Sequence, residues 1–162
     1  MKFNTASDQE ILDGEASDVY FERSIKSMEK DAGDDQVTME VTTSGNGQPW
    51  VVFCGLDEVI TLLSGRNVTL NAIPEGTVIG SRDCHGVPVP FLSIRGKYED
   101  IGRLETAILG FICQATGIAT ASSRIRIAAG DLPYYSFGIR RMHPAISPMI
   151  DRASVIGGAD GV

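Results

Sequence analysis

Two adjacent arginines, Arg140 and Arg141, are the side chains of this sequence whose type and spacing best suit chemistry. They follow the run YYSFGI at residues 134–139, in which aromatic and β-branched side chains alternate as they do in a strand. Gly138 lets the backbone come close to a ligand, and Pro144 stands where the first turn of a helix tolerates proline. Guanidinium groups grip carboxylates and phosphates, and a helix start adds backbone donors, so the segment predicts an anion site. Two surface arginines paired with nearby acids are the open alternative.

The charges of the chain are unevenly distributed. Its net charge is -7, which argues against nucleic acid or an anionic membrane as the main partner. Residues 1–40 hold eleven acidic and four basic side chains, whereas residues 121–152 hold five arginines and two aspartates. The five arginines are Arg124, Arg126, Arg140, Arg141 and Arg152. An arginine cluster inside an acidic protein indicates selective capture of a small anion.

Composition and cysteine usage predict a soluble, cytoplasmic protein. Hydrophobic residues make up 43% and charged residues 22% of the chain, and no charge-free apolar run reaches the about 18 residues of a membrane span. The N-terminus lacks the apolar core of a signal peptide. Cys54, Cys84 and Cys113 form no CxxC pair and are odd in number, which favours reduced thiols in core or loop positions.

The first 102 residues alternate short helical and strand patterns, which predicts a compact α+β layer domain. Helices are expected after a cap at Ser7, from Asp18 to Lys30, and from a cap at Asp57 to Leu63. Strands are expected at residues 37–43, 49–54, 68–73 and 77–81, with the turn SGNGQ joining the first two. A hairpin at residues 82–87 leads into VPVPFLSIRGKY, whose prolines place its beginning at a sheet edge.

Residues 103–162 predict the opening of a larger α/β domain. Residues 103–130 form a helical pattern with apolar side chains on every face, so this helix needs protein on all sides. The strand pattern at residues 134–139 precedes a helix through about Ala153, and Val155 and Ile156 begin another strand-like run. One strand and one helix cannot make a parallel sheet alone, because parallel strands need neighbours and covering helices. We therefore expect a chain that is a fragment or needs a partner.

Several segments together resemble the nicotinate phosphoribosyltransferases, in the order of that family. These segments are ASDVYFER, IPEGT, VPVPFLSIRGKY, LETAILGFICQATGIATASSRIRIAAG, SFGIRRMHP and GGADGV. The resemblance implies an N-terminal α/β sandwich domain at residues 1–102. It also implies a bridging helix and the first strand–helix unit of an incomplete α/β barrel at residues 103–162. Members of the family work as dimers with active sites at the subunit interface, so a homodimer or higher homo-oligomer is expected.

The reaction implied by the resemblance is a step of NAD salvage. Nicotinate attacks C1 of phosphoribosyl pyrophosphate and forms nicotinate mononucleotide and pyrophosphate, with Mg²⁺ and coupled ATP hydrolysis. The ligands of Mg²⁺ and ATP are expected outside this chain. The family's catalytic histidine would follow Val162, so His143 is expected at a helix start near the anion site and His85 in a hairpin turn. The chain therefore holds at most half an active site.

The family's substrate-binding positions match Tyr20, Phe137, Gly138, Arg140 and Arg141. Tyr20 and Phe137 would sandwich the flat pyridine ring, each from a different subunit. Arg140 would lie near the substrate carboxylate and the reacting ribose and act in catalysis, while Arg141 would bind phosphate. The transition state needs positioning and a stabilised pyrophosphate more than it needs a nucleophile. Without the resemblance, Tyr20 and Phe137 would be interpreted as core residues.

Two alternatives are open. Quinolinate phosphoribosyltransferase shares the helix ending GIAT, but its helix begins with a glutamate–arginine pair where Glu105 and Thr106 stand here. A second substrate carboxylate requires that extra cation, so Thr106 favours the monocarboxylate. In a different class, the chain is a non-catalytic module that binds a ligand or partner through the half-site and the exposed apolar helix.

Overall fold

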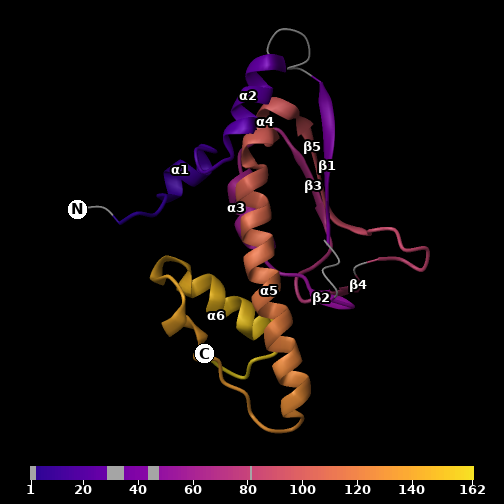
Figure 1. The fold of residues 1–162 in the computed structure, drawn as a ribbon, viewed down its shortest axis with the longest axis vertical. Helices are drawn as coiled ribbons and strands as arrows, with labels where there is room; N and C mark the ends of the chain where they lie inside the picture. The colour runs from indigo at the N-terminus through magenta and orange to yellow at the C-terminus, as the bar shows by residue number, and fades with distance from the viewer. Residues whose placement is uncertain (1–2, 29–34, 44–47, 81) are drawn as a thin grey trace.

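The computed structural model describes residues 3–28, 35–43, 48–80 and 82–162, and its longest element is the helix α5 (Glu105–Ala129). Figure 1 shows the N-terminal helices and the strands beside the upper part of α5 and the C-terminal segment beside its lower part. The short elements α4 (Tyr98–Ile101) and η1 (Gly102–Leu104) connect the last strand to α5. The mixed helix and strand content agrees with the α+β class predicted for the N-terminal residues.

The strands form two small antiparallel sheets. One has the order β1 (Gln36–Thr42), β5 (Pro90–Lys97), β3 (Thr69–Ala72). The other pairs β2 (Trp50–Val52) with β4 (Val78–Gly80). All four strands predicted before residue 82 are present at nearly the predicted residues. However, β1 and β2 pair in different sheets and not with each other, and the predicted turn between them lies largely outside the described residues.

The strand β5 is central in its sheet, although its beginning has a neighbour on one side only, as the prolines predict. It pairs with β1 on one side and with β3 on the other. Pro90 is its first residue and pairs only with Thr42 of β1, at a point where the register of β1 shifts. A proline at the first position removes no ladder hydrogen bond from the strand interior, so the strand can still be central.

The first two helices begin where the sequence predicts. At α1 (Asp8–Leu12), Ser7 and Glu10 form a reciprocal capping box, in which the Ser7 amide donates to Glu10 Oε2 at 2.7 Å and the Glu10 amide donates to Ser7 Oγ at 3.3 Å. The helix α2 (Val19–Met28) starts directly after Asp18. Its predicted end at Lys30 lies outside the described residues.

The helix α3 (Leu56–Leu63) is capped differently from the prediction. Its N-cap is Gly55, with φ of 101°, and Asp57 lies in the first turn instead. The cap is supplied from another segment, because Glu75 Oε1 accepts hydrogen bonds from the amides of Gly55 at 2.6 Å and Leu56 at 2.8 Å. A carboxylate at this end also complements the helix dipole.

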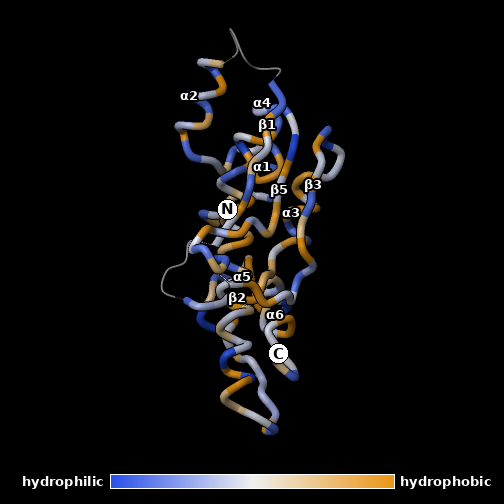
Figure 2. The backbone as a smooth tube through the Cα atoms, turned by 90° about the vertical axis from the view of Figure 1, so that its right-hand side faces the viewer, coloured by the Kyte–Doolittle hydropathy of each residue, from blue (hydrophilic) through white to orange (hydrophobic). Residues whose placement is uncertain are grey.

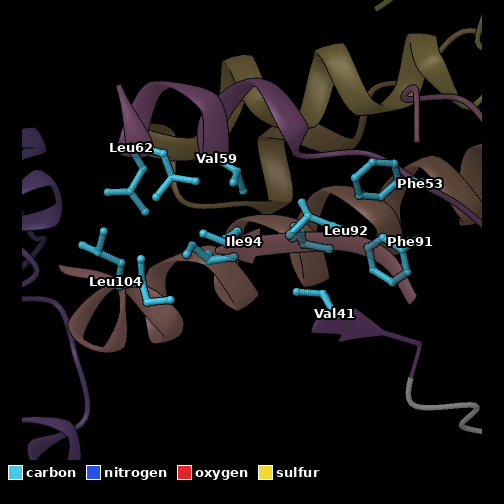
Figure 3. Close-up of a cluster of buried hydrophobic side chains, with 12 residues drawn as sticks. Val41, Phe53, Val59, Leu62, Phe91, Leu92, Ile94 and Leu104 are labelled. Carbon is cyan, nitrogen blue, oxygen red and sulfur yellow. The ribbon is translucent and has the colours of Figure 1, made fainter. Parts of the chain in front are cut away.

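The main core lies where α3 and the first half of α5 cover the three-stranded sheet. Its fully buried side chains include Phe53, Val59, Leu92, Ile94 and Ile108. Figure 3 shows Val59 and Leu62 of α3 facing Ile94 and Leu92 of β5. Each such aliphatic side chain contributes about 1.5 to 3 kcal/mol through removal from water. The turned view in Figure 2 shows apolar colour along β5, α3 and α5, in agreement with a core between these elements.

The helix α5 is buried along one side only. Ile108, Ile112, Ala115 and Ala119 are buried, whereas side chains such as Leu109, Ile125 and Ile127 are exposed. The stretch from Tyr98 to Ala129 is long and apolar enough to cross a membrane by length and composition. Its buried side packs against α3, β2 and α6, so we interpret it as a core helix whose remaining apolar faces have no cover in the described residues.

The segment after α5 differs most from the sequence prediction. The expected strand at residues 134–139 is reduced to one parallel bridge between Tyr135 and Gly161. It is followed by two 3-10 turns, η2 (Gly138–Arg141) and η3 (Pro144–Ile146), and by α6 (Ser147–Ile156). Val155 and Ile156 end α6 and do not begin a strand. A parallel strand needs hydrogen-bonding neighbours on its flanks, and the described residues provide only this bridge.

Candidate functional site

The arginine pair lies on an exposed turn. Arg140 and Arg141 belong to η2, and neither side chain forms a hydrogen bond or ion pair with the described residues. The guanidinium carbon of Arg140 lies 5.8 Å from the centroid of the Phe137 ring, and Phe137 is 66% exposed. This distance allows a cation–π contact. The turn therefore presents an aromatic ring and two unpaired guanidinium groups on one short segment.

The other three arginines of the C-terminal cluster are engaged inside the chain. Arg124 binds the Gln48 side chain and lies over the Trp50 ring. Arg126 binds Asp160, and Arg152 binds Glu75 and Asp57. The five arginines are thus not one free basic patch, and the small-anion site inferred from the charge count stays a prediction. Only Arg140 and Arg141 remain available to an external anion.

The position of Tyr20 is also exposed, so Tyr20 is not a core residue of this chain. Its side chain on α2 is 53% exposed, and the core position belongs to its neighbour Phe21, whose ring centroid is 4.0 Å away. Partial desolvation, followed by the nearby carboxylates of Glu105 and Asp18, raises the pKa of the Tyr20 hydroxyl. Tyr20 is therefore a neutral aromatic surface beside acidic groups at neutral pH.

Thr106 ties the start of α5 to α2. Its hydroxyl accepts a hydrogen bond from the Asp18 amide and donates one to Asp18 Oδ2, both at 3.2 Å. Desolvation and then the Asp18 carboxylate raise the pKa of the adjacent Glu105. Where the glutamate–arginine pair of quinolinate phosphoribosyltransferase is expected to have its arginine, this chain has the Thr106 hydroxyl, which is bonded to the Asp18 carboxylate.

Tyr20 and Phe137 lie near opposite ends of α5. Asp18, beside Tyr20, is bonded to Thr106, whereas the segment leading to Phe137 is held by Arg126 through the carbonyl of Leu132 at 2.5 Å. Thr106 and Arg126 are 20 residues apart on one helix, which is about 30 Å. Figure 1 shows α2 beside the upper end of α5 and the segment that precedes α6 beside its lower half. Within one chain, the two aromatic side chains cannot contact the same pyridine ring.

Both histidines have the local positions expected from the sequence. His143 is the N-cap of η3, where its Nδ1 accepts a hydrogen bond from the Ala145 amide at 3.2 Å. His85 lies in the turn before β5, and its amide donates to Asp83 Oδ1 at 2.8 Å. Across the described residues, no three His, Cys, Asp or Glu side chains are grouped to hold a metal ion. The described residues therefore offer no preformed cluster of such ligands, and we derive no chemical step through Mg²⁺.

An ion pair between Glu75 and Arg152 was not foreseen from the sequence. Arg152 Nη1 donates to Glu75 Oε1 at 3.1 Å, and its Nη2 contacts Glu75 Oε2 and, at 2.6 Å, Asp57 Oδ2. Burial alone would raise the pKa of Glu75, but the hydrogen bonds from Arg152, Leu56 and Gly55 lower it overall. The partners are 77 residues apart, so no local pattern predicts their contact. The only sequence signal at Glu75 is that it belongs to the IPEGT segment, which resembles the family.

The thiol next to this ion pair is unsuited to nucleophilic chemistry. Burial and then the Glu75 carboxylate raise the pKa of Cys54 to about 12, so its thiol is neutral at physiological pH.

An apolar groove of about 510 Å³ runs along α5 and is lined by Phe91, Leu109, Ile112 and Cys113, among others. None of the predicted site residues lines this groove. Tyr20, Phe137, Arg140 and Arg141 are exposed at the surface and lie outside this groove.

The fold is that of the N-terminal part of a phosphoribosyltransferase. A family model for the quinolinate phosphoribosyl transferase N-terminal domain matches residues 18–116, and the chain belongs to this family. A nicotinate phosphoribosyltransferase of Mycobacterium tuberculosis is 38% identical over 69 residues, which are 43% of this chain and 15% of that enzyme. The predicted resemblance to the N-terminal part of such enzymes is confirmed.

Two solved structures extend the comparison over nearly the whole chain. The nicotinate-nucleotide pyrophosphorylase from Pyrococcus furiosus is 48% identical, with a TM-score of 0.91, over 100% of this chain and 41% of that protein. Human nicotinic acid phosphoribosyltransferase shares the fold at 21% identity, with a TM-score of 0.76, over 90% of this chain and 35% of that protein. The chain spans less than half the length of either protein.

Proposed function

We propose that this chain is the N-terminal part of a cytoplasmic nicotinate phosphoribosyltransferase that acts in NAD salvage. The enzyme would join nicotinate to phosphoribosyl pyrophosphate and release nicotinate mononucleotide and pyrophosphate, with Mg²⁺ and ATP hydrolysis supplied through residues outside this chain. The observation that carries the proposal is the exposed Phe137 ring beside the Arg140 guanidinium, in a turn whose two arginine side chains form no ion pair with the described residues. An aromatic carboxylate and a phosphorylated sugar are complementary to this combination.

Each residue of this segment has a separate proposed role. The face of Phe137 would pack on the pyridine ring, and Arg140 would bind the carboxylate of nicotinate near the reacting ribose carbon. Arg141 would bind phosphate or the departing pyrophosphate. Gly138 would leave room at the ring, because a Cβ atom there would meet only the Ser136 hydroxyl, at 3.6 Å. This arrangement accelerates transfer by orientation and charge, and it requires no protein nucleophile.

We further propose that Tyr20 completes the site from a second copy of the chain. Within one chain the two aromatic residues are separated by most of the length of α5, and both are exposed. A homodimer that brings the α2 end of one copy to the η2 end of the other would give the pyridine ring two aromatic faces. The exposed apolar side chains of α5 also favour cover by further protein.

The division into domains is part of the same proposal. Residues 1–102 would form the N-terminal sandwich domain, and residues 103–162 the bridging helix and the opening of an α/β barrel. The parallel bridge between Tyr135 and Gly161 supports this assignment, because α6 lies between its two partners in the chain. Two parallel segments joined through a helix are the beginning of a βαβ unit.

Quinolinate phosphoribosyltransferase is the second candidate. It is favoured by the family model, which is named after that enzyme, and by the 48% identity to a nicotinate-nucleotide pyrophosphorylase. Against it stands the environment of Tyr20, where Thr106 is bonded to Asp18 and Glu105 is adjacent. A second substrate carboxylate at this position would face acidic groups and no new cation, which disfavours a dicarboxylate.

The two candidates form the same nucleotide but differ in their pyridine substrate and in the release of CO₂. With protein expressed from the complete native reading frame, we expect turnover of nicotinate and phosphoribosyl pyrophosphate, increased by ATP, with kcat/KM for quinolinate lower by about 10²-fold or more. Thr106→Arg should reduce the difference in kcat/KM between nicotinate and quinolinate. Arg95 is exposed, so Arg95→Gln serves as a surface control for this variant. Quinolinate turnover with release of CO₂, and none of nicotinate, would reverse the assignment. Nicotinate binding without any turnover would favour the non-catalytic module.

A further inference from the structure

The Glu75–Arg152 ion pair joins three segments that are distant in the sequence. Glu75 belongs to the turn between β3 and β4, its two amide contacts are at the start of α3, and Arg152 belongs to α6. The Glu75 side chain is only 12% exposed, whereas the Asp57 side chain, the other partner of Arg152, is 64% exposed. A bidentate contact to a shielded carboxylate is stronger than a contact to an exposed one, so Glu75 is the main anchor of Arg152.

The helix α6 carries this anchor to the arginine segment. It follows η2 and η3 directly in the chain and contacts η2 in space. Ser154 Oγ lies 3.3 Å from Ser136 Oγ, next to Phe137, and the Ser154 carbonyl accepts a hydrogen bond from Ser122 of α5 at 2.6 Å. A shift of α6 relative to α3 would therefore move the ring and guanidinium groups at residues 137–141.

We propose that Arg152 and Glu75 are positioning residues for the anion site formed by Phe137, Arg140 and Arg141. Their ion pair fixes α6 against the start of α3, and α6 in turn fixes the turn η2 on which the two arginines stand. The inference rests on the proposed phosphoribosyl transfer at that site. Neither residue needs to contact the substrate, because small displacements of positioned groups cost orders of magnitude in rate.

Kinetics of Arg152 variants test the role in catalysis. In the native full-length protein, Arg152→Ala should lower kcat/KM for nicotinate by about 10- to 100-fold. Arg152→Lys should recover part of this loss, since it keeps the charge without the fork. Arg95→Ala, which removes an exposed arginine of β5, should leave kcat/KM unchanged. In a double-mutant cycle, Arg140→Ala should lower kcat/KM much less in the Arg152→Ala background than in the wild type, because a displaced Arg140 already contributes less to catalysis. The proposal would be overturned if the fold-losses in kcat/KM of the two single variants multiply in the double variant. An unchanged kcat/KM in Arg152→Ala would also overturn it.

Amide hydrogen exchange tests the positioning without any substrate. Arg152→Lys and Arg152→Ala should accelerate exchange at residues 134–146 while β5 keeps its protection. Equal protection of residues 134–146 in the wild type and both variants would refute the positioning role. If the native protein has no activity with nicotinate, the proposed function fails, and the exchange result still decides whether Arg152 orders this segment. If Arg152→Ala does not fold, Arg152→Lys supplies both measurements.

Discussion

Replacing Arg140 with alanine is expected to remove about 2 to 4 kcal/mol of transition-state stabilisation, measured as a fall in kcat/KM for nicotinate. The reason is that Arg140 is placed beside Phe137 with no ion pair to the described residues, so its charge is available to the reacting substrate. Loss of a preorganised cation weakens the transition state more than it weakens the fold. Thermal unfolding should therefore change little in this variant.

The neighbouring arginine provides an internal comparison. Arg141→Lys should have a mild effect if Arg141 meets phosphate as a point charge, and a severe effect if its guanidinium fork is bidentate. Both variants are measured by steady-state kinetics with nicotinate and with phosphoribosyl pyrophosphate varied separately. Unchanged kinetics in both variants would remove this pair from the site.

The second large effect is expected at the contact between α5 and α6. A Cβ atom at Gly157 would lie 2.2 Å from the Ala119 carbonyl oxygen and 2.6 Å from Ser122 Cβ. The carbonyl belongs to helix backbone and cannot rotate away, so the two helices must separate. We expect Gly157→Ala to lower the free energy of unfolding by about 3 kcal/mol or more, at the upper end of overpacking costs. For a chain of this size that corresponds to a fall in Tm of about 6 to 12 °C.

A matched glycine on α5 controls for the change in residue type. A Cβ atom at Gly110 would meet no atom within 4 Å, so Gly110→Ala should leave stability unchanged or raise it by up to about 1 kcal/mol through helix propensity. Calorimetry on the two variants separates packing from propensity. Equal Tm values for Gly157→Ala and Gly110→Ala would mean that α6 does not pack on α5 as described.

The elements that the sequence predicted correctly are those whose signals are local. The capping box at Ser7 and Glu10 and the alternation in β1 and β3 are contained within a few residues, and each appears at nearly the predicted position. The strand predicted at residues 134–139 has a similar local pattern but is a strand only where Tyr135 meets Gly161. Local propensity cannot supply the neighbouring strands that a parallel strand requires.

The candidate site divides in the same way. That Arg140 and Arg141 are surface side chains could be anticipated from the sequence, which left open whether nearby acids pair with them. The engagement of Arg152 could not, because its partners Glu75 and Asp57 come from elements far away in the chain. The Glu75 carboxylate also caps α3, in place of the cap predicted at Asp57. Charge counts along a sequence therefore overestimate the cations that are free to bind a ligand.

The central claim is that one substrate site is built from the α2 end of one copy and the η2 end of another. Tyr20→Ala subunits and Arg140→Ala subunits, each defective alone, test it when they are combined in verified heterodimers. Tyr20→Ala by itself should lose about 1 to 3 kcal/mol in kcat/KM for nicotinate with little change in Tm, since its ring is exposed. A shared site places both defects in one site of the heterodimer and leaves the other intact, so activity well above that of either homodimer is predicted. Heterodimers no more active than the two homodimers would contradict the shared site.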